Sequence, residues 1–169
     1  MIPLVKKWKV KIPALSGEKE RRAYIYLPAS YFKDTSKRYP VMYMFDGHNI
    51  FYDAVSAFGK SWNMNSYMVE SKKELIIVGI ECGHGEGERL SEYLPWPALQ
   101  HSFCKGISPT GDYTFEWIIK ELKPVIDADY RTYPVRSCTA IGGSSMGGLM
   151  ALYGALHCNE HFSKAACIS

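Results

Sequence analysis

The residues best suited to covalent chemistry lie near the end of the chain, where Gly143-Ser144-Ser145-Met146-Gly147 forms a Gly-x-Ser-x-Gly pattern. A serine hydroxyl is a weak nucleophile until it is held exposed, beside a base and opposite backbone donors for the oxyanion on the attacked carbonyl. A sharp turn from a strand into a helix provides that exposure, and the pattern lies between a predicted strand and a predicted helix. The sequence therefore predicts Ser145 as a nucleophile.

The residues beside Ser145 fit the same interpretation. In so tight a turn, a side chain at Gly143 or Gly147 would collide with the neighbouring strand and helix. Met146 offers its backbone N–H at the N-terminus of the helix, where the helix dipole favours negative charge. We expect this amide to form half of an oxyanion hole, and Ser144 to lie at the substrate.

Two other kinds of glycine-rich turn, which bind phosphate or a dinucleotide, are alternative interpretations of this segment. A phosphate-binding loop would carry Lys after its final glycine, where Leu149 stands, and the G-x-G-x-x-G of a dinucleotide site is absent. A turn that only packs a helix against a strand stays open as an alternative. No cofactor is expected.

The elements that must position Ser145 begin with predicted strands. Val5 to Leu15 and Arg22 to Leu27 are rich in β-branched and aromatic residues and predict a strand pair. Pro40 to Phe45 and Leu75 to Ile80 are short apolar runs typical of strands buried on both faces. A helix over Trp62 to Glu70 connects these two strands.

The second half of the chain continues the alternation. Cys82 to Thr110 predicts a long functional loop with short helices, because it is rich in Gly, Pro and His and has no clear period. Gly111 to Asp129 predicts an amphipathic helix with Pro124 as a kink or boundary, and its apolar stripe comprises Phe115, Ile118, Ile119, Leu122, Val125 and Ile126. A strand over Ser137 to Ile141, a helix over Met146 to His157 and a strand over Lys164 to Ser169 follow.

Alternating strands and helices predict the α/β class, with a mostly parallel sheet flanked by helices. The 169 residues are expected to form a single domain. The composition is 47% hydrophobic and 22% charged, which is typical of a globular protein and excludes the disordered class.

Charge and cysteine content indicate which binding partners and which cellular location to expect. The net charge is +3 and the basic residues are scattered, so no nucleic-acid partner is expected. No apolar run approaches ~20 residues and no export signal is recognisable, so no membrane association is expected. The five cysteines contain no C-x-x-C pair, which favours free thiols and a cytoplasmic location.

Three further segments carry a family resemblance. They are Phe45-Asp46-Gly47-His48-Asn49-Ile50-Phe51, Arg89-Leu90-Ser91-Glu92-Tyr93-Leu94-Pro95, and Glu121-Leu122-Lys123-Pro124 followed by Asp127 to Thr132. With the Ser145 pattern, the chain resembles the esterase D type of α/β-hydrolase, whose members include S-formylglutathione hydrolases, feruloyl and acetyl xylan esterases, siderophore esterases and mycolyltransferases. The resemblance covers nearly the whole chain in the family's order.

The resemblance implies an α/β-hydrolase fold and a serine carboxylic-ester hydrolase that acts through an acyl-enzyme on Ser145. The implied substrate is a small-molecule or carbohydrate-linked ester. The loop Asp46-Gly47-His48 would supply the second oxyanion donor through the backbone N–H of His48, with Asp46 and Gly47 at the substrate. The family often has Gln where His48 stands, so we expect its imidazole to orient the loop or to contact substrate.

The resemblance also implies a catalytic acid and a histidine that follow the serine along the chain. Only 24 residues follow Ser145, and Glu160, His157 and His161 lie in or just beyond a helix that leads away from it. We therefore expect the acid and the base after residue 169, and a sheet that is incomplete on its C-terminal side, whose open edge a second copy of the chain could complete. His84 and His101 are the alternative bases.

Other functions stay open. Acyl transfer to an alcohol would use the same residues, and a fold relative without activity would keep the turn without the chemistry. The aromatic residues Tyr93, Trp96 and Phe103 could stack on a sugar or an aromatic acyl group, but aromatics in a long loop more often seal the core. No metal site is expected, because Cys82 and His84 are too few for zinc.

Overall fold

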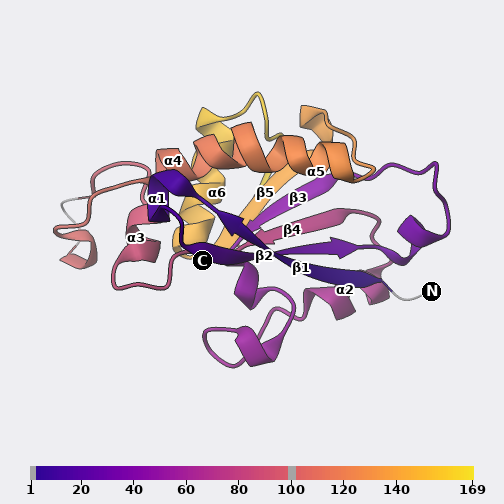
Figure 1. Cartoon of the computed structure of the whole chain (residues 1–169), viewed down its shortest axis with the longest axis horizontal. Helices are drawn as coiled ribbons and strands as arrows, with labels where there is room; N and C mark the ends of the chain where they lie inside the picture. Colours follow the sequence, from indigo (N-terminus) through magenta and orange to yellow (C-terminus); the bar gives the residue numbers. More distant parts are fainter. Residues whose placement is uncertain (1–2, 99–101) are drawn as a thin grey trace.

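A computed structural model describes residues 3–98 and 102–169, and its centre is a six-stranded sheet in the order β1-β2-β4-β3-β5-β6 (Figure 1). β1 pairs antiparallel with β2 and β2 with β4, whereas the other neighbours are parallel. The α/β class and the mostly parallel sheet are thus confirmed. The strands are β1 (Leu4–Lys11), β2 (Glu20–Leu27), β3 (Val41–Phe45), β4 (Ile76–Ile80), β5 (Thr139–Ser144) and β6 (Lys164–Ile168).

Helices cover both faces of the sheet. α4, α5 and α6 lie on one face and α2 lies on the other (Figure 1). The helices are α1 (Pro13–Ser16), α2 (Met64–Ser71), α3 (Glu88–Glu92), α4 (Gly111–Trp117), α5 (Lys123–Asp129) and α6 (Met146–His157), with a π-helical turn over Ile118–Leu122 between α4 and α5.

The core is divided by the sheet, because successive residues of a strand point to opposite faces. The larger cluster joins Ile25, Leu27, Tyr43, Phe45, Val78 and Ile141 of the strands to Phe115, Ile118, Leu122, Ile126 and Met150 of the helices. The smaller cluster joins Tyr24, Tyr26, Met44 and Ile77 to Phe51 and to Met68 of α2. Both faces are therefore packed, which explains the continuous apolar runs of β3 and β4.

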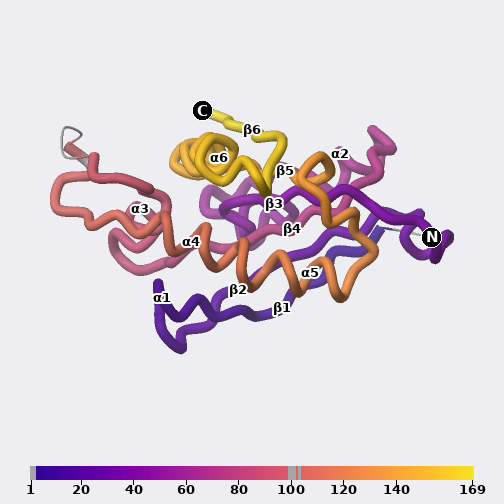
Figure 2. The backbone as a smooth tube through the Cα atoms, turned by 90° about the horizontal axis from the view of Figure 1, so that it is seen from above, coloured from indigo at the N-terminus to yellow at the C-terminus, as the bar shows by residue number. Residues whose placement is uncertain are grey.

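The topology gathers the ends of the parallel strands at one edge. Phe45 of β3 pairs with Ile80 of β4, and Met44 pairs with Gly142 of β5. The loops that leave these strands therefore begin side by side, as is usual for ligand sites of open α/β sheets. Figure 2 shows α6 and β6 together at one side of the sheet and β1 at the opposite side.

Two of the predicted strands have the wrong bounds. β1 ends at Lys11, because Pro13 lacks a backbone N–H and begins the short helix α1 instead of extending the strand. β5 begins at Thr139, since Arg136–Cys138 form a 3₁₀ turn. It also runs on to Ser144, because its last residues pair with β6.

The predicted helix over Gly111 to Asp129 is present with a change of geometry in its middle. Lys123 and Pro124 begin α5, so the predicted boundary at the proline is confirmed. From the π turn into α5 the buried residues follow a spacing of four, from Ile118 to Leu122 and on to Ile126. Val125 was predicted on the apolar stripe but is 53% exposed, because the wider turn rotates it off the core face.

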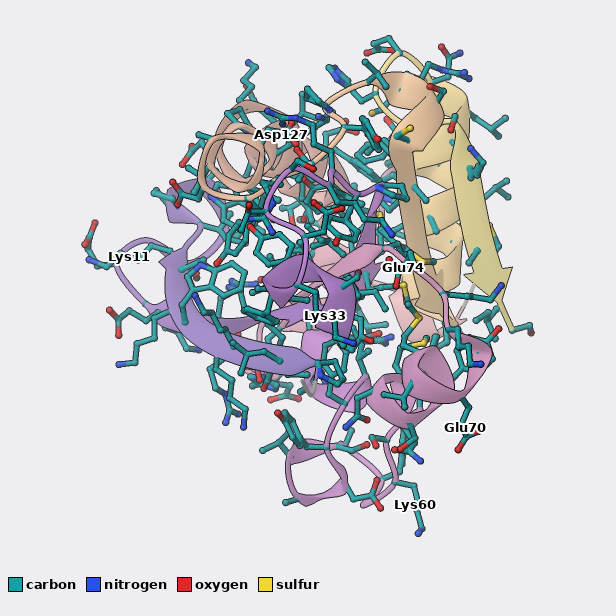
Figure 3. The ribbon with its side chains drawn as sticks, turned by 90° about the vertical axis from the view of Figure 1, so that its right-hand side faces the viewer. Lys11, Lys33, Lys60, Glu70, Glu74 and Asp127 are labelled. Atoms are coloured by element: carbon teal, nitrogen blue, oxygen red, sulfur yellow. The ribbon has the colours of Figure 1, made fainter. Side chains whose placement is uncertain are left out.

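The surface carries dispersed charges. Figure 3 shows the side chains of Lys11, Lys60 and Glu70 projecting from the periphery of the molecule. Lys11 pairs with Glu18 at 2.5 Å and Lys60 with Asp53 at 3.6 Å, both exposed. Among residues 3–98 and 102–169, none of the helices has the length and apolar character needed to cross a bilayer.

Candidate active site

The turn between β5 and α6 holds Ser145 in a strained and exposed conformation. Its backbone angles are φ 54° and ψ −123°, a region that residues with a side chain rarely adopt. Its amide donates a 2.8 Å hydrogen bond to the carbonyl of Ile168, and its carbonyl accepts one of 3.0 Å from the amide of Leu149. The backbone is therefore fixed on both sides of an exposed hydroxyl.

The collision expected at Gly143 is confirmed by the geometry, whereas a side chain at Gly147 would make only tight contacts. A Cβ atom on Gly143 would lie 2.6 Å from the carbonyl carbon and oxygen of Gly147. One on Gly147 would lie 3.0 Å from the Cβ of Phe45 and 3.3 Å from an oxygen of Asp46. The glycines thus permit the turn, and the second distance shows that the Asp46 loop borders the first turn of α6.

The loop after β3 turns sharply at Asp46, whose φ of 55° and ψ of 50° are left-handed. The amides of Asn49 and Ile50 close the turn on the carbonyls of Asp46 and Gly47, at 2.8 and 3.4 Å, and the amide of His48 is a donor in neither bond. Gly47 packs on the backbone of β4, where an added Cβ would lie 2.7 Å from the amide nitrogen of Ile80.

The amide of Met146 lies in the first turn of α6, where backbone donors have no acceptor within the helix. The two amides that were predicted as oxyanion donors, Met146 and His48, therefore belong to two adjoining turns. The side chain of Asp46, which was predicted at the substrate, is only 4% exposed and binds a partner from another element.

That partner is Arg89, in α3. Its Nε and Nη2 atoms donate to the two carboxylate oxygens of Asp46, each at 2.8 Å. This hydrogen bonding raises the pKa of Arg89, so the guanidinium stays charged. The amide of Asp46 also donates a 3.0 Å hydrogen bond to the hydroxyl of Tyr93, whose burial raises its pKa.

Glu92, in the same helix, anchors the other side. Its carboxylate accepts hydrogen bonds of 2.7 and 2.9 Å from Arg21 of β2 and one of 2.9 Å from the amide of Gly83. Both side chains of the ion pair are about 5% exposed. The Arg-x-x-Glu-Tyr motif therefore positions the loops after β3 and β4. This role was not predicted from the sequence, although the motif that signals it was recognised.

A second polar group gathers where β4 ends. Glu81 accepts a 2.7 Å hydrogen bond from the hydroxyl of Tyr24, forms a 2.9 Å ion pair with Nε of Arg22, and lies 3.4 Å from Nε2 of His84. Burial opposes ionisation of Glu81, but these hydrogen bonds together outweigh it and lower its pKa. His48 lies nearby, and the centroid of its ring is 5.2 Å from that of the His84 ring.

The remaining predicted residues are dispersed. Tyr93 is 2% exposed and belongs to the core, as favoured above, whereas Trp96 is 44% exposed and packs on Tyr153 with centroids 5.5 Å apart. His157 ends α6, about 18 Å along the helix from Ser145. His101 and the side chain of Phe103 lie outside the described residues.

The sequence itself matches a family model described as "Putative esterase" over residues 15–169. The chain belongs to this esterase family. The resemblance predicted from the motifs is thus confirmed. A curated relative of this esterase-family chain is the "Uncharacterized protein YbbA" of Bacillus subtilis (strain 168), with 28% identity over 152 residues that cover 88% of the chain and 56% of the relative.

Solved structures confirm the α/β-hydrolase fold. A ferulic acid esterase superposes with a TM-score of 0.67 at 22% identity, over 99% of this chain and 59% of its own. An IroE-like serine hydrolase from Shewanella oneidensis superposes with a TM-score of 0.72 at 22% identity, over 98% of this chain and 49% of its own. The ferric enterobactin esterase of Salmonella typhimurium superposes with a TM-score of 0.66 at 17% identity, over 98% of this chain and 35% of its own. The chain thus spans between about a third and three fifths of the length of these proteins.

Proposed function

We propose that this esterase-family chain carries the nucleophile of a serine carboxylic-ester hydrolase. Ser145 Oγ attacks the acyl carbonyl, the alcohol leaves, and water releases the acid from the acyl-enzyme. The observation that carries the proposal is the exposed Ser145 at positive φ between β5 and α6, in a turn where Gly143 leaves no room for a Cβ atom and Gly147 leaves little.

In this proposal the oxyanion binds to the backbone N–H groups of Met146 and His48. Backbone donors stabilise a developing charge best when they are already oriented, because no reorganisation accompanies the reaction. The Arg89–Asp46 pair and the Tyr93 hydroxyl supply that orientation for the His48 turn. Ser144 and Gly47 would border the acyl group.

The base and the acid are proposed to follow residue 169 in the whole protein, since the similar solved structures are roughly twice as long. His84 is the alternative base within the described residues, because it is half-exposed and faces Glu81. The proposed substrate is a small-molecule or carbohydrate-linked ester, and acyl transfer to an alcohol would use the same nucleophile.

The test is hydrolysis of p-nitrophenyl acetate by the protein expressed from its complete reading frame. Ser145→Ala should reduce kcat by about 10³-fold or more. Ser71→Ala, on an exposed position of α2, is the matched control and should leave the rate unchanged. Mass spectrometry of the protein treated with an organophosphonate ester should find the adduct on Ser145. Full activity in Ser145→Ala would reject the nucleophile, and product analysis with an added alcohol would separate hydrolysis from acyl transfer.

A further inference from the structure

Three potential metal ligands converge beside the candidate active site. His48 follows β3, whereas Glu81 and His84 follow β4, and one nitrogen or oxygen atom from each lies within 4.8 Å of the other two. The sequence alone predicts no metal site, because Cys82 and His84 are too few ligands for zinc. The register of β3 and β4 adds His48 and Glu81 to the same place.

The imidazole of His48 lacks a partner that its burial demands. The residue is 6% exposed, and its Nδ1 atom has no hydrogen-bond partner within the part of the chain that the structure describes. Buried polar atoms are nearly always hydrogen-bonded, so a buried nitrogen without a partner points to a ligand. Burial is the main cause that lowers the pKa of His48, and a neutral imidazole is the form that binds metals.

Glu81 has one oxygen available. Its Oε1 atom is held by the hydroxyl of Tyr24 and by Nε of Arg22, at 2.7 and 2.9 Å. Its Oε2 atom has only longer contacts, 3.4 Å to His84 and 3.3 Å to the amide of Arg22. A carboxylate that is held firmly through one oxygen and only by long contacts through the other resembles a metal ligand with an outer-shell partner.

The cluster is accessible from solvent. Glu81 and His84 line a cleft of about 280 Å³, and the side chain of His84 is 55% exposed. The cleft is also lined by basic side chains, but each has a carboxylate partner: Lys9 with Glu20, Lys19 with Glu88, Arg21 with Glu92 and Arg22 with Glu81. A cation can therefore reach the site without meeting an uncompensated positive charge.

We propose that His48, Glu81 and His84 bind one transition-metal ion of the zinc type, with a fourth position left to solvent. Two imidazoles and one carboxylate are a donor set that suits zinc, whereas magnesium and calcium prefer oxygen ligands alone. Ligand atoms around tetrahedral zinc are roughly 3.4 Å apart. The cluster must therefore contract on binding, which the exposed His84 can accommodate.

A competing set of Asp46, His48 and Cys82 also lies within 4.8 Å. It fits less well, because both oxygens of Asp46 are already bound to Arg89.

The test is direct titration of the metal-free protein with Zn²⁺ by calorimetry and with Co²⁺ by visible absorption. We expect one equivalent, with the absorption of a four- or five-coordinate Co²⁺. His84→Ala should weaken binding by about 100-fold, since it removes a ligand while the exposed position tolerates the change. Glu81→Gln should weaken binding as well, and Cys82→Ser should not.

His157→Ala is the matched control, because this histidine stacks on Tyr153 in α6 and lies outside the cluster. Circular dichroism verifies that each variant is folded. Absence of a one-equivalent Zn²⁺ complex, or equal affinity in His84→Ala and the unmodified protein, would overturn the proposal. Loss of binding in Cys82→Ser with retention in His84→Ala would assign the metal to the competing set instead and would overturn it too. All readouts are independent of ester hydrolysis, so the outcome does not depend on Ser145.

Discussion

The two turns that border the candidate site are held by different forces. The turn at Ser145 is shaped by the absence of side chains and by backbone hydrogen bonds to β6 and within α6. The turn at Asp46 to His48 is held by hydrogen bonds with the side chains of Arg89 of α3 and of Tyr93, which follows α3. Beside it, Glu92 of α3 holds the loop after β4 through a buried ion pair with Arg21 and a hydrogen bond from Gly83. The first turn is a steric device and the second is an electrostatic one.

This difference determines how each turn responds to change. A steric device fails when an atom is added, because the backbone of a neighbouring element must move. An electrostatic device fails when one charge is removed, because the partner is left buried without compensation. Substitutions at the two turns should therefore differ in size and in what repairs them.

The largest effect is expected for Glu92→Ala. Removal of this carboxylate leaves Arg21 buried and unpaired, which should lower the free energy of unfolding by about 3–5 kcal/mol. Urea unfolding measures it. Glu116→Ala breaks an exposed pair with Lys120 and should cost only about 0.5 kcal/mol.

Removing both charges of the Arg21–Glu92 pair tests the cause of this loss. The double variant Arg21→Met/Glu92→Met should regain most of the lost stability, because it buries no charge. A loss below about 1 kcal/mol in Glu92→Ala would show that water or another donor replaces the carboxylate.

Gly143→Ala should come next, with a loss of about 2–3 kcal/mol in the same assay, because the new methyl group lies 2.6 Å from backbone atoms of α6. Gly59→Ala is the control: its φ of +66° strains an alanine but no atom lies within 4 Å, so only about 1 kcal/mol is expected. Equal losses in the two variants would mean that the turn is not sterically tight.

Arg89→Met tests whether the electrostatic device serves the reaction. The pair with Asp46 is partly exposed, so the stability loss should be about 1–2 kcal/mol. In the complete protein, kcat for p-nitrophenyl acetate should fall by about 10–100-fold with little change in KM, because a misplaced amide fails mainly in the transition state. A change in KM alone would assign Arg89 to substrate binding.

The smallest effect concerns acid stability. The pKa of Glu81 in the folded chain is below its ordinary value of 4.5, so its contribution is complete above that value and is lost as pH falls through the folded pKa. Unfolding free energies measured from roughly pH 6 to pH 3 should therefore fall less steeply in Glu81→Gln than in the unmodified chain. Glu116→Gln, on the exposed face of α4, controls for the change in net charge, and equal slopes in Glu81→Gln and the unmodified chain would contradict the prediction.

Much of the fold followed from patterns within short segments. The helix over Met146 to His157 was predicted with the bounds that it has, and the sharp turn at Ser145 was predicted from five consecutive residues. Such features depend on helical period, on apolar runs and on glycine sterics, which neighbouring residues decide among themselves. The end of β5 at Ser144 was missed because strand ends depend on which residues find a partner strand.

The tertiary structure decided the rest. Asp46 and Arg89 are 43 residues apart and Arg21 and Glu92 are 71 apart, and no local pattern links them. His48 and Glu81 likewise meet only because β3 and β4 pair in parallel and end together. The amino-acid sequence determined which turns and helices form, since backbone sterics act over a few residues. Which charges, imidazoles and amides share a site was decided by strand register, since a parallel sheet joins the ends of strands that the chain keeps far apart.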